Sequence, residues 1–137
     1  MNLPGSATED EFHISVAELL DACLLPPTFY TTFPAGYGKL GKATAGSLKG
    51  AGLKAGFADI LVFHDHGALG IELKTATGKV TAIQEETHKA LAAAGVPVYV
   101  CRSVEAVAEA LVLHKIPMRK YQWQDRRGLR STPLAAT

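Results

Sequence analysis

The sequence predicts an α/β fold in which a small mixed β-sheet is flanked by helices. Two apolar, β-prone runs, Ile60–Phe63 and Leu69–Leu73, surround a polar turn that contains Asp65 and Gly67, a pattern typical of a β-hairpin. A helical pattern and a further apolar run at residues 96–101 follow, so the second hairpin strand and this run form a β-α-β crossover, expected to be right-handed. Antiparallel and parallel pairing together make the sheet mixed.

Local signals delimit the helices around this sheet. Apolar residues recur at 3.6-residue spacing in the first helix, which Pro26-Pro27 ends. Thr81 and Gln84 form a T-x-x-Q capping box for the central helix, and Gly95 ends it. The expected elements are a helix over residues 9–25, a strand over 29–33, the hairpin, a helix over 82–94, a buried strand over 96–101 and a helix over 104–114 with Val107, Ala108, Leu111 and Val112 on its inner face.

Length and composition predict one domain over residues 1–137. Its core is expected at residues 9–116, followed by a basic, partly disordered tail at 117–137 in which Tyr121 and Trp123 are anchors. Cys23 and Cys101 each lie in an apolar run and are expected to be buried free thiols. No run approaches the roughly 20 apolar residues that span a membrane, and no basic apolar leader is visible, so a cytoplasmic protein is expected.

The net charge of +1 is uninformative, but the distribution of charge is not. Residues 1–38 carry acids and no Lys or Arg, whereas residues 39–54 and 115–137 are basic. Two basic segments around an acidic centre suit a polyanion held over a metal, although solvated surface lysines explain them equally well. The residues expected to touch a DNA backbone are Lys39, Lys42, Lys49 and Lys54.

The glycine-rich segment over residues 34–56 is a long loop, with a short helical turn as an option near residues 43–49. Its stretch Gly36–Lys42 matches both GxGxxG and GxxxxGK. Neither match is specific, because the first needs a β-α-β context and the second needs Ser or Thr where Ala43 stands. A loop whose lysines touch DNA is the better interpretation.

Three charged residues interrupt the apolar strands and need a reason, because burying an unpaired charge is costly. A turn centred near residues 65–66 places Asp59 opposite Glu72, and strand period two places Lys74 on the same face as Glu72. Mg²⁺ and Mn²⁺ prefer carboxylate and carbonyl oxygens, which Asp59, Glu72 and the Leu73 carbonyl supply. Lys74 suits the positioning of a water and the offsetting of phosphorane charge. The alternative is a cross-strand salt bridge between Asp59 and Lys74, which leaves Glu72 unexplained.

Asp59 followed by Glu72-Leu73-Lys74 resembles the PD-(D/E)XK nuclease motif, with Ala58 in place of the usual proline. The stretches GLKAGFADILVF, GIELKTATGKVTAIQ and AAGVPVYVCRSVEAV are similar to the virus-type replication-repair nuclease (VRR-NUC) family, over roughly residues 9–112. This resemblance implies a restriction-endonuclease-like core and hydrolysis of phosphodiester bonds that depends on Mg²⁺ or Mn²⁺.

The resemblance also implies roles for individual residues. The motif acids and lysine fall on Asp59, Glu72 and Lys74, and the glutamine of the next helix falls on Gln84, which also serves as a capping residue. The glutamate of the first helix falls on Glu11, with Glu18 as the alternative; Glu11 also complements the helix dipole. Stand-alone phage and bacterial members resemble Holliday-junction resolvases, which implies a homodimer acting on branched DNA in a bacterial or phage-infected cell.

The sequence is also consistent with other functions. A general nicking or restriction-type endonuclease has the same site, and a non-catalytic DNA-binding module has the same fold. Among the remaining polar residues, His88 is expected at the surface or on the DNA backbone, and His64 and His66 are expected to be exposed beside the turn. His13 points elsewhere than Glu11, since residues two apart do not share a helix face.

Overall fold

The computed structural model describes residues 9–33, 50–52, 54–125 and 128–132. The expected loop turn near residues 43–49 and Lys39, Lys42 and Lys49 lie outside these residues. The elements are α1 (Glu9–Cys23), β1 (Phe29–Thr32), β2 (Ile60–His64), β3 (Gly67–Leu73), α3 (Ala82–Ala93), β4 (Val98–Cys101), α4 (Val104–Leu113), β5 (Gln122–Asp125) and β6 (Gly128–Ser131). They follow the predicted order closely up to α4.

The first four strands form one mixed sheet in the order β1-β2-β3-β4. β1, β2 and β3 pair antiparallel and β3 pairs parallel with β4, so the predicted mixed sheet and its hairpin are confirmed. The sequence predicts a buried strand at β4, but β4 lies at the edge of the sheet and Val100 is 39% exposed. A short apolar run has the same sequence pattern in an edge strand and in a central strand. The prediction that β4 is buried was therefore wrong.

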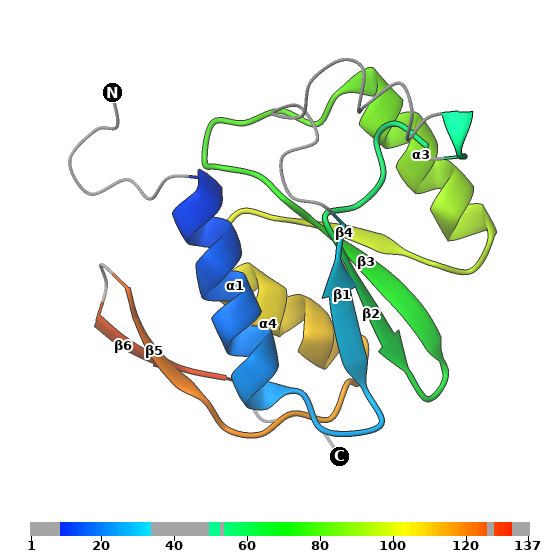
Figure 1. Ribbon diagram of the computed structural model, residues 1–137. Coiled ribbons are helices and arrows are strands. Elements are labelled where there is room, and N and C mark those ends of the chain that lie inside the picture. Colours follow the sequence, from blue (N-terminus) through cyan, green and yellow to red (C-terminus); the bar gives the residue numbers. More distant parts are fainter. Residues whose placement is uncertain (1–8, 34–49, 53, 126–127, 133–137) are drawn as a thin grey trace.

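One face of the sheet carries the hydrophobic core, and α1 and α4 cover it side by side (Figure 1). All apolar positions predicted for the inner face of α1 are buried. On α4 the prediction is correct except at Val112, which is half-buried, while Ala110 is buried. The largest fully buried side chains include Val16, Leu19 and Leu20 of α1, Ile60 and Val62 of β2, Leu69 and Ile71 of β3, and Val107 and Leu111 of α4.

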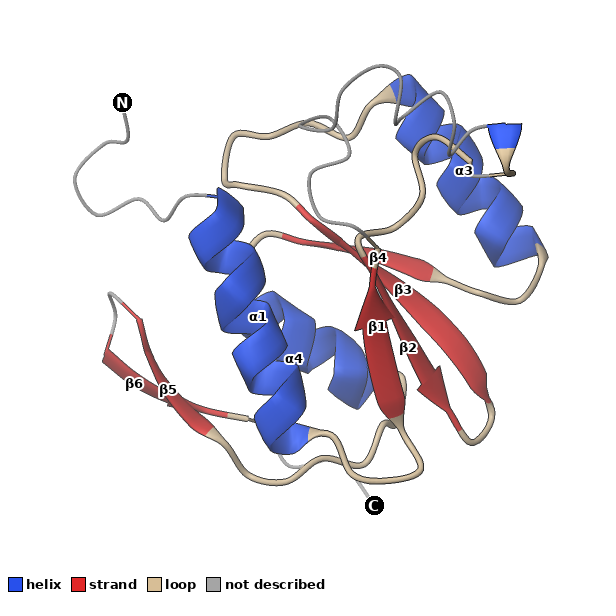
Figure 2. Cartoon of the chain, in the orientation of Figure 1, coloured by secondary structure: helices blue, strands red, loops and turns tan. Residues whose placement is uncertain are grey.

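The opposite face of the sheet is turned toward α3 (Figure 2). Strand alternation divides β3 between the two faces: Leu69, Ile71 and Leu73 enter the core, whereas Gly70 and Glu72 point to the other side. α3 contributes no fully buried side chain, so it covers this face without building a second apolar core. The acid Glu72 is therefore buried outside the main core, beneath a largely polar helix.

The basic tail is more structured than the sequence predicts. β5 and β6 form an antiparallel hairpin, which extends the ordered fold well beyond residue 116. Tyr121 and Trp123 pack against the core, in agreement with their predicted role as anchors. The hairpin is tied down at its base, where the Arg119 amide donates to the Cys23 carbonyl (2.7 Å) and the Thr132 hydroxyl is buried. Its strands are short and mostly polar, so they carry little of the apolar alternation by which a strand is recognised.

Two further expectations concern the whole chain. Cys23 and Cys101 are buried free cysteines, as predicted, and burial raises the pKa of each thiol to about 11. Within the described ranges, no helix combines the length and the apolar character needed to cross a membrane.

Candidate active site

The β2–β3 hairpin brings the predicted carboxylates together. Its register pairs Ile60 with Ile71, so Asp59, which directly precedes β2, lies level with Glu72. The Leu73 amide donates a hydrogen bond to Oδ2 of Asp59 at 2.7 Å, which fixes this carboxylate against the end of β3. The structure thus places Asp59 and Glu72 as the sequence predicts.

Glu72 is in an unfavourable electrostatic position. Only 3% of the residue is exposed, and its Oε1 atom has no hydrogen-bond partner among the described residues. Burial, followed by the neighbouring Asp59 carboxylate, raises the pKa of Glu72 to about 8, and the Lys74 charge opposes this rise only in part. A buried carboxyl group with a second carboxylate beside it needs a compensating positive charge.

The sequence places His88 at the surface, but the structure places it beside Glu72. Its side chain is 12% exposed, and Nε2 lies 3.5 Å from Oε1 of Glu72 without forming a hydrogen bond. Burial and the Lys74 charge lower the pKa of His88. The one available signal was its spacing, because His88 follows Gln84 by one helical turn on the same face of α3.

Lys74 follows β3 directly and is half-buried. Its charge acts on both Glu72 and His88, which places the ammonium close to the two groups. No ion pair joins Lys74 to Asp59, both of which the structure describes, so the salt-bridge alternative is not observed. The chain then turns at residues 75–78, where the Arg102 guanidinium donates to the carbonyls of Thr75 (2.8 Å) and Gly78.

The start of α3 is locked beside the site in two ways. Thr81 and Gln84 form the predicted capping box, in which Oε1 of Gln84 accepts from the Thr81 amide at 2.9 Å. The segment before β2 also packs on α3, with the Thr87 hydroxyl donating to the Ala55 carbonyl at 2.6 Å. Gly56 has φ +76°, and a Cβ there would lie 2.7 Å from the Ile83 carbonyl oxygen. Because the side-chain oxygen of Gln84 accepts the capping hydrogen bond, its side-chain amide nitrogen is the group that can donate to the site.

Besides the predicted Glu11, a second acid of α1 is a candidate for the site. The charge of Glu9, the first residue of the helix, raises the Glu72 pKa, so Glu9 lies within electrostatic reach of the site. Glu9, Glu11 and Glu18 are all exposed, and Glu9 and Glu11, two residues apart, do not share a helix face. Glu9 was not singled out from the sequence, because three consecutive acids in a first turn are explained by the helix dipole. Of the lysines predicted to touch DNA, Lys54 is described and exposed.

The residues present fit a divalent cation. Two carboxylates lie side by side, and the more buried of them, Glu72, has an oxygen with no hydrogen-bond partner among the described residues. Burial and the neighbouring Asp59 raise the pKa of Glu72, and the Lys74 charge offsets this only in part. Carboxylate oxygens are the ligands that Mg²⁺ and Mn²⁺ prefer. A cation bound here would favour the ionised form of both carboxylates, which the protein alone disfavours at Glu72.

Comparisons with known proteins support the fold. No protein-family model and no curated protein matches the chain. A solved structure described as "VRR_NUC domain protein" is similar, with 22% sequence identity and a TM-score of 0.58, over 77% of this chain and 85% of that chain. The fold implied by the resemblance to VRR-NUC proteins is therefore confirmed.

Proposed function

We propose that this chain is a nuclease of the VRR-NUC type that hydrolyses phosphodiester bonds in DNA with Mg²⁺ or Mn²⁺. The observation that carries the proposal is the buried Glu72 carboxyl group beside Asp59, whose raised pKa the Lys74 charge offsets only in part. A protein that needed only a stable fold would gain by replacing such a group with an apolar one. The shared fold with a VRR_NUC domain protein agrees with this interpretation.

Each residue of the site has a distinct task in this proposal. Asp59, held by the Leu73 amide, and Glu72 bind the cation. The Leu73 carbonyl, Glu11 and Glu9 are further candidate ligands. When bound, the cation polarises the phosphate and acidifies water. Lys74 orients the attacking water and offsets the charge that develops on the phosphate oxygens. Gln84 donates from its side-chain amide nitrogen while its oxygen keeps the helix cap closed.

The fit of the two carboxylates also separates a nuclease from a non-catalytic DNA-binding module. A binding module gains nothing from a buried acid beside a second carboxylate, because burying such a group lowers the stability of the fold. The buried acid therefore favours the enzyme over the binding module. The choice between branched DNA and ordinary duplex rests on the family resemblance alone, and that resemblance favours four-way junctions cut by a homodimer, since two nicks need two sites.

Cleavage of matched linear, flapped and four-way DNA tests the proposal. Wild-type protein should cut in Mg²⁺ or Mn²⁺ and not in chelator, and Asp59→Asn and Lys74→Met should each lower the cleavage rate at least about 100-fold while DNA binding is retained. Matched controls on the exposed surface of α3 are Glu86→Gln and Lys89→Met, which should cut at the wild-type rate.

Two results would count against the proposal. Wild-type cleavage by Lys74→Met would exclude the role assigned to Lys74. DNA binding without cleavage, together with no heat of Mn²⁺ binding in calorimetry, would favour the non-catalytic module. The mass of the protein in solution, measured alone and with a four-way junction, tests the homodimer.

A further inference from the structure

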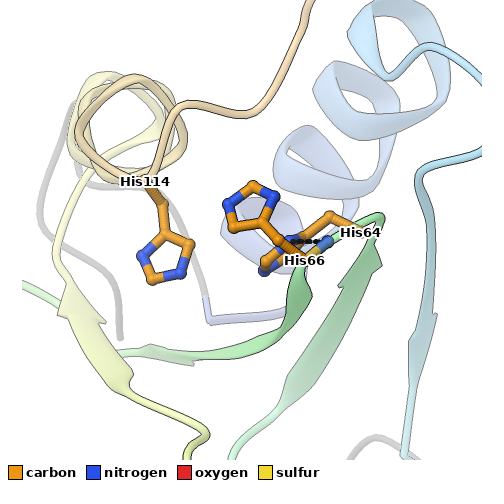
Figure 3. A group of neighbouring side chains, drawn as sticks. All are labelled: His64, His66 and His114. Carbon is orange, nitrogen blue, oxygen red and sulfur yellow. Dashed lines mark hydrogen bonds between the residues drawn. The ribbon is translucent and has the colours of Figure 1, made fainter.

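A second group of titratable side chains lies at the other end of the hairpin. Nitrogen atoms of His64, His66 and His114 all lie within 4.8 Å of one another. His64 ends β2, His66 lies in the turn before β3, and His114 is the C-cap of α4 (Figure 3). β3 separates this group from Glu72 by five residues or more, a distance of roughly 17 Å along a strand, so it is not part of the candidate active site.

Two of the three rings have a polar partner at Nδ1. The Asp65 carboxylate lies 2.7 Å from Nδ1 of His66, and the Tyr99 hydroxyl lies 3.1 Å from Nδ1 of His114. The Asp65 carboxylate accepts a hydrogen bond, so it favours the tautomer of His66 with the proton on Nδ1 and leaves Nε2 to bind a metal. The Tyr99 hydroxyl can accept from Nδ1 of His114 in the same way. These are the outer-shell contacts that accompany histidine ligands in metalloproteins.

His64 supplies a separate observation. Its Nε2 atom is buried and has no hydrogen-bond partner among the described residues. Its Nδ1 accepts a long hydrogen bond of 3.3 Å from the His66 amide. When Nε2 binds a metal, the proton of the neutral ring is on Nδ1, so this hydrogen bond would be lost. Burial, followed by the neighbouring imidazoles, lowers the pKa of His64, and burial likewise lowers that of His114.

We propose that His64, His66 and His114 form a binding site for a transition-metal ion of the zinc class, separate from the carboxylate site. Three imidazoles with an open fourth position suit Zn²⁺, whereas Mg²⁺ and Mn²⁺ prefer oxygen ligands. Metal–nitrogen bonds of about 2.1 Å in a tetrahedron put ligand atoms about 3.4 Å apart, so the side chains need to close by roughly 1 Å. His66 is exposed in the turn and is the ring with the most freedom to move.

Metal binding at this place has a structural consequence. His64 and His66 belong to the hairpin, whereas His114 belongs to the C-terminal end of α4, about 50 residues later in the sequence. One ion would therefore link the turn of the hairpin to the helix on the core face of the sheet. Because it binds the folded state and not the unfolded chain, the ion should raise the melting temperature.

Zn²⁺ titration of the metal-free protein tests the site, with the melting temperature and the visible absorption of Co²⁺ as readouts. Glu72→Gln is the background for every measurement, because it removes the carboxylate site as a competitor. In this background, Zn²⁺ should raise the melting temperature in a saturable way, Co²⁺ should give the intense absorption of a tetrahedral complex, and excess Mg²⁺ should not displace either ion.

Three single variants in that background assign the ligands. His66→Ala and His114→Ala should each weaken Zn²⁺ binding at least about tenfold. His13→Ala, on α1 and away from the cluster, should bind Zn²⁺ as the parent does and is the matched control. His66 is exposed, so its variant is expected to fold. Absence of Zn²⁺ binding by the parent, or unchanged affinity in His66→Ala, would overturn the proposal. The outcome is independent of nuclease activity.

Discussion

Glu72→Gln in metal-free protein should abolish one component of the pH dependence of stability. The folded wild-type protein keeps the Glu72 proton up to a pH of about 8, whereas an ordinary glutamate has a pKa of 4.5. Between these values the folded state binds more protons than the unfolded chain. Stability from this group therefore falls as the pH rises through that window. Glutamine has the same shape and no proton to lose, so this component should disappear.

The expected magnitude is large for a single residue. One proton of difference corresponds to about 1.4 kcal/mol per pH unit, so Glu72 should cost about 3 kcal/mol between pH 5.5 and 7.5. In a domain of this size, that is a fall of roughly 10 °C in melting temperature. The pKa values of His64, His88 and His114 are lowered in the folded protein, so these residues have the opposite effect on stability. As the pH falls through 6.5, the unfolded chain binds protons more readily at these histidines, and the stability of the folded state decreases. The difference between wild type and variant isolates Glu72.

Thermal unfolding in chelator at pH 5.5, 6.5 and 7.5 measures this difference. Glu72→Gln should become progressively more stable than wild type as the pH rises, and Glu86→Gln on exposed α3 should follow wild type. Mn²⁺ added at pH 7.5 should raise the melting temperature of wild type and have little effect on Glu72→Gln. Parallel curves for wild type and Glu72→Gln would refute the reasoning, because the carboxyl group would then titrate alike in the folded and unfolded states.

Two further predictions concern the surroundings of the site. Gly56→Ala should destabilise the protein by at least about 2 kcal/mol in denaturant unfolding, because its left-handed backbone disfavours a Cβ and that Cβ would meet the first turn of α3. Gly52→Ala, also at positive φ but with nothing within 4 Å, should cost less; equal losses would exclude the steric cause. Arg102→Ala should lower the cleavage rate about tenfold with little change in DNA affinity, because it releases the turn after Lys74. Unchanged cleavage would show that this turn does not position Lys74.

The parts of the fold and site that the sequence predicted depend on local patterns. The hairpin register follows from a short polar turn between two apolar runs, and it suffices to place Asp59 opposite Glu72. The capping box likewise lies within four residues. Such features need no knowledge of how distant segments meet, so the sequence alone could predict them.

The parts that the sequence missed depend on contacts between distant segments. His88 lies beside Glu72 because the loop at Gly56 packs tightly on α3, and a helical pattern alone does not show which polar residue such packing will bury. Glu9 acts on the charge of Glu72 because the first turn of α1 lies within electrostatic range of β3. His114 meets the hairpin turn only through the packing of α4 on the sheet.

The side chains of β3 face the correct sides of the sheet only in the observed register with β2. If β3 slipped by one residue against β2, Leu73 would face α3 and the Glu72 carboxyl group would enter the hydrocarbon core among α1 and α4. Such a misaligned strand would bury an acid among apolar side chains, at a cost of several kcal/mol. The acid that weakens the folded protein at neutral pH thus also penalises its nearest misfolded competitor. Replacing it with an apolar residue would remove this penalty on the misaligned hairpin.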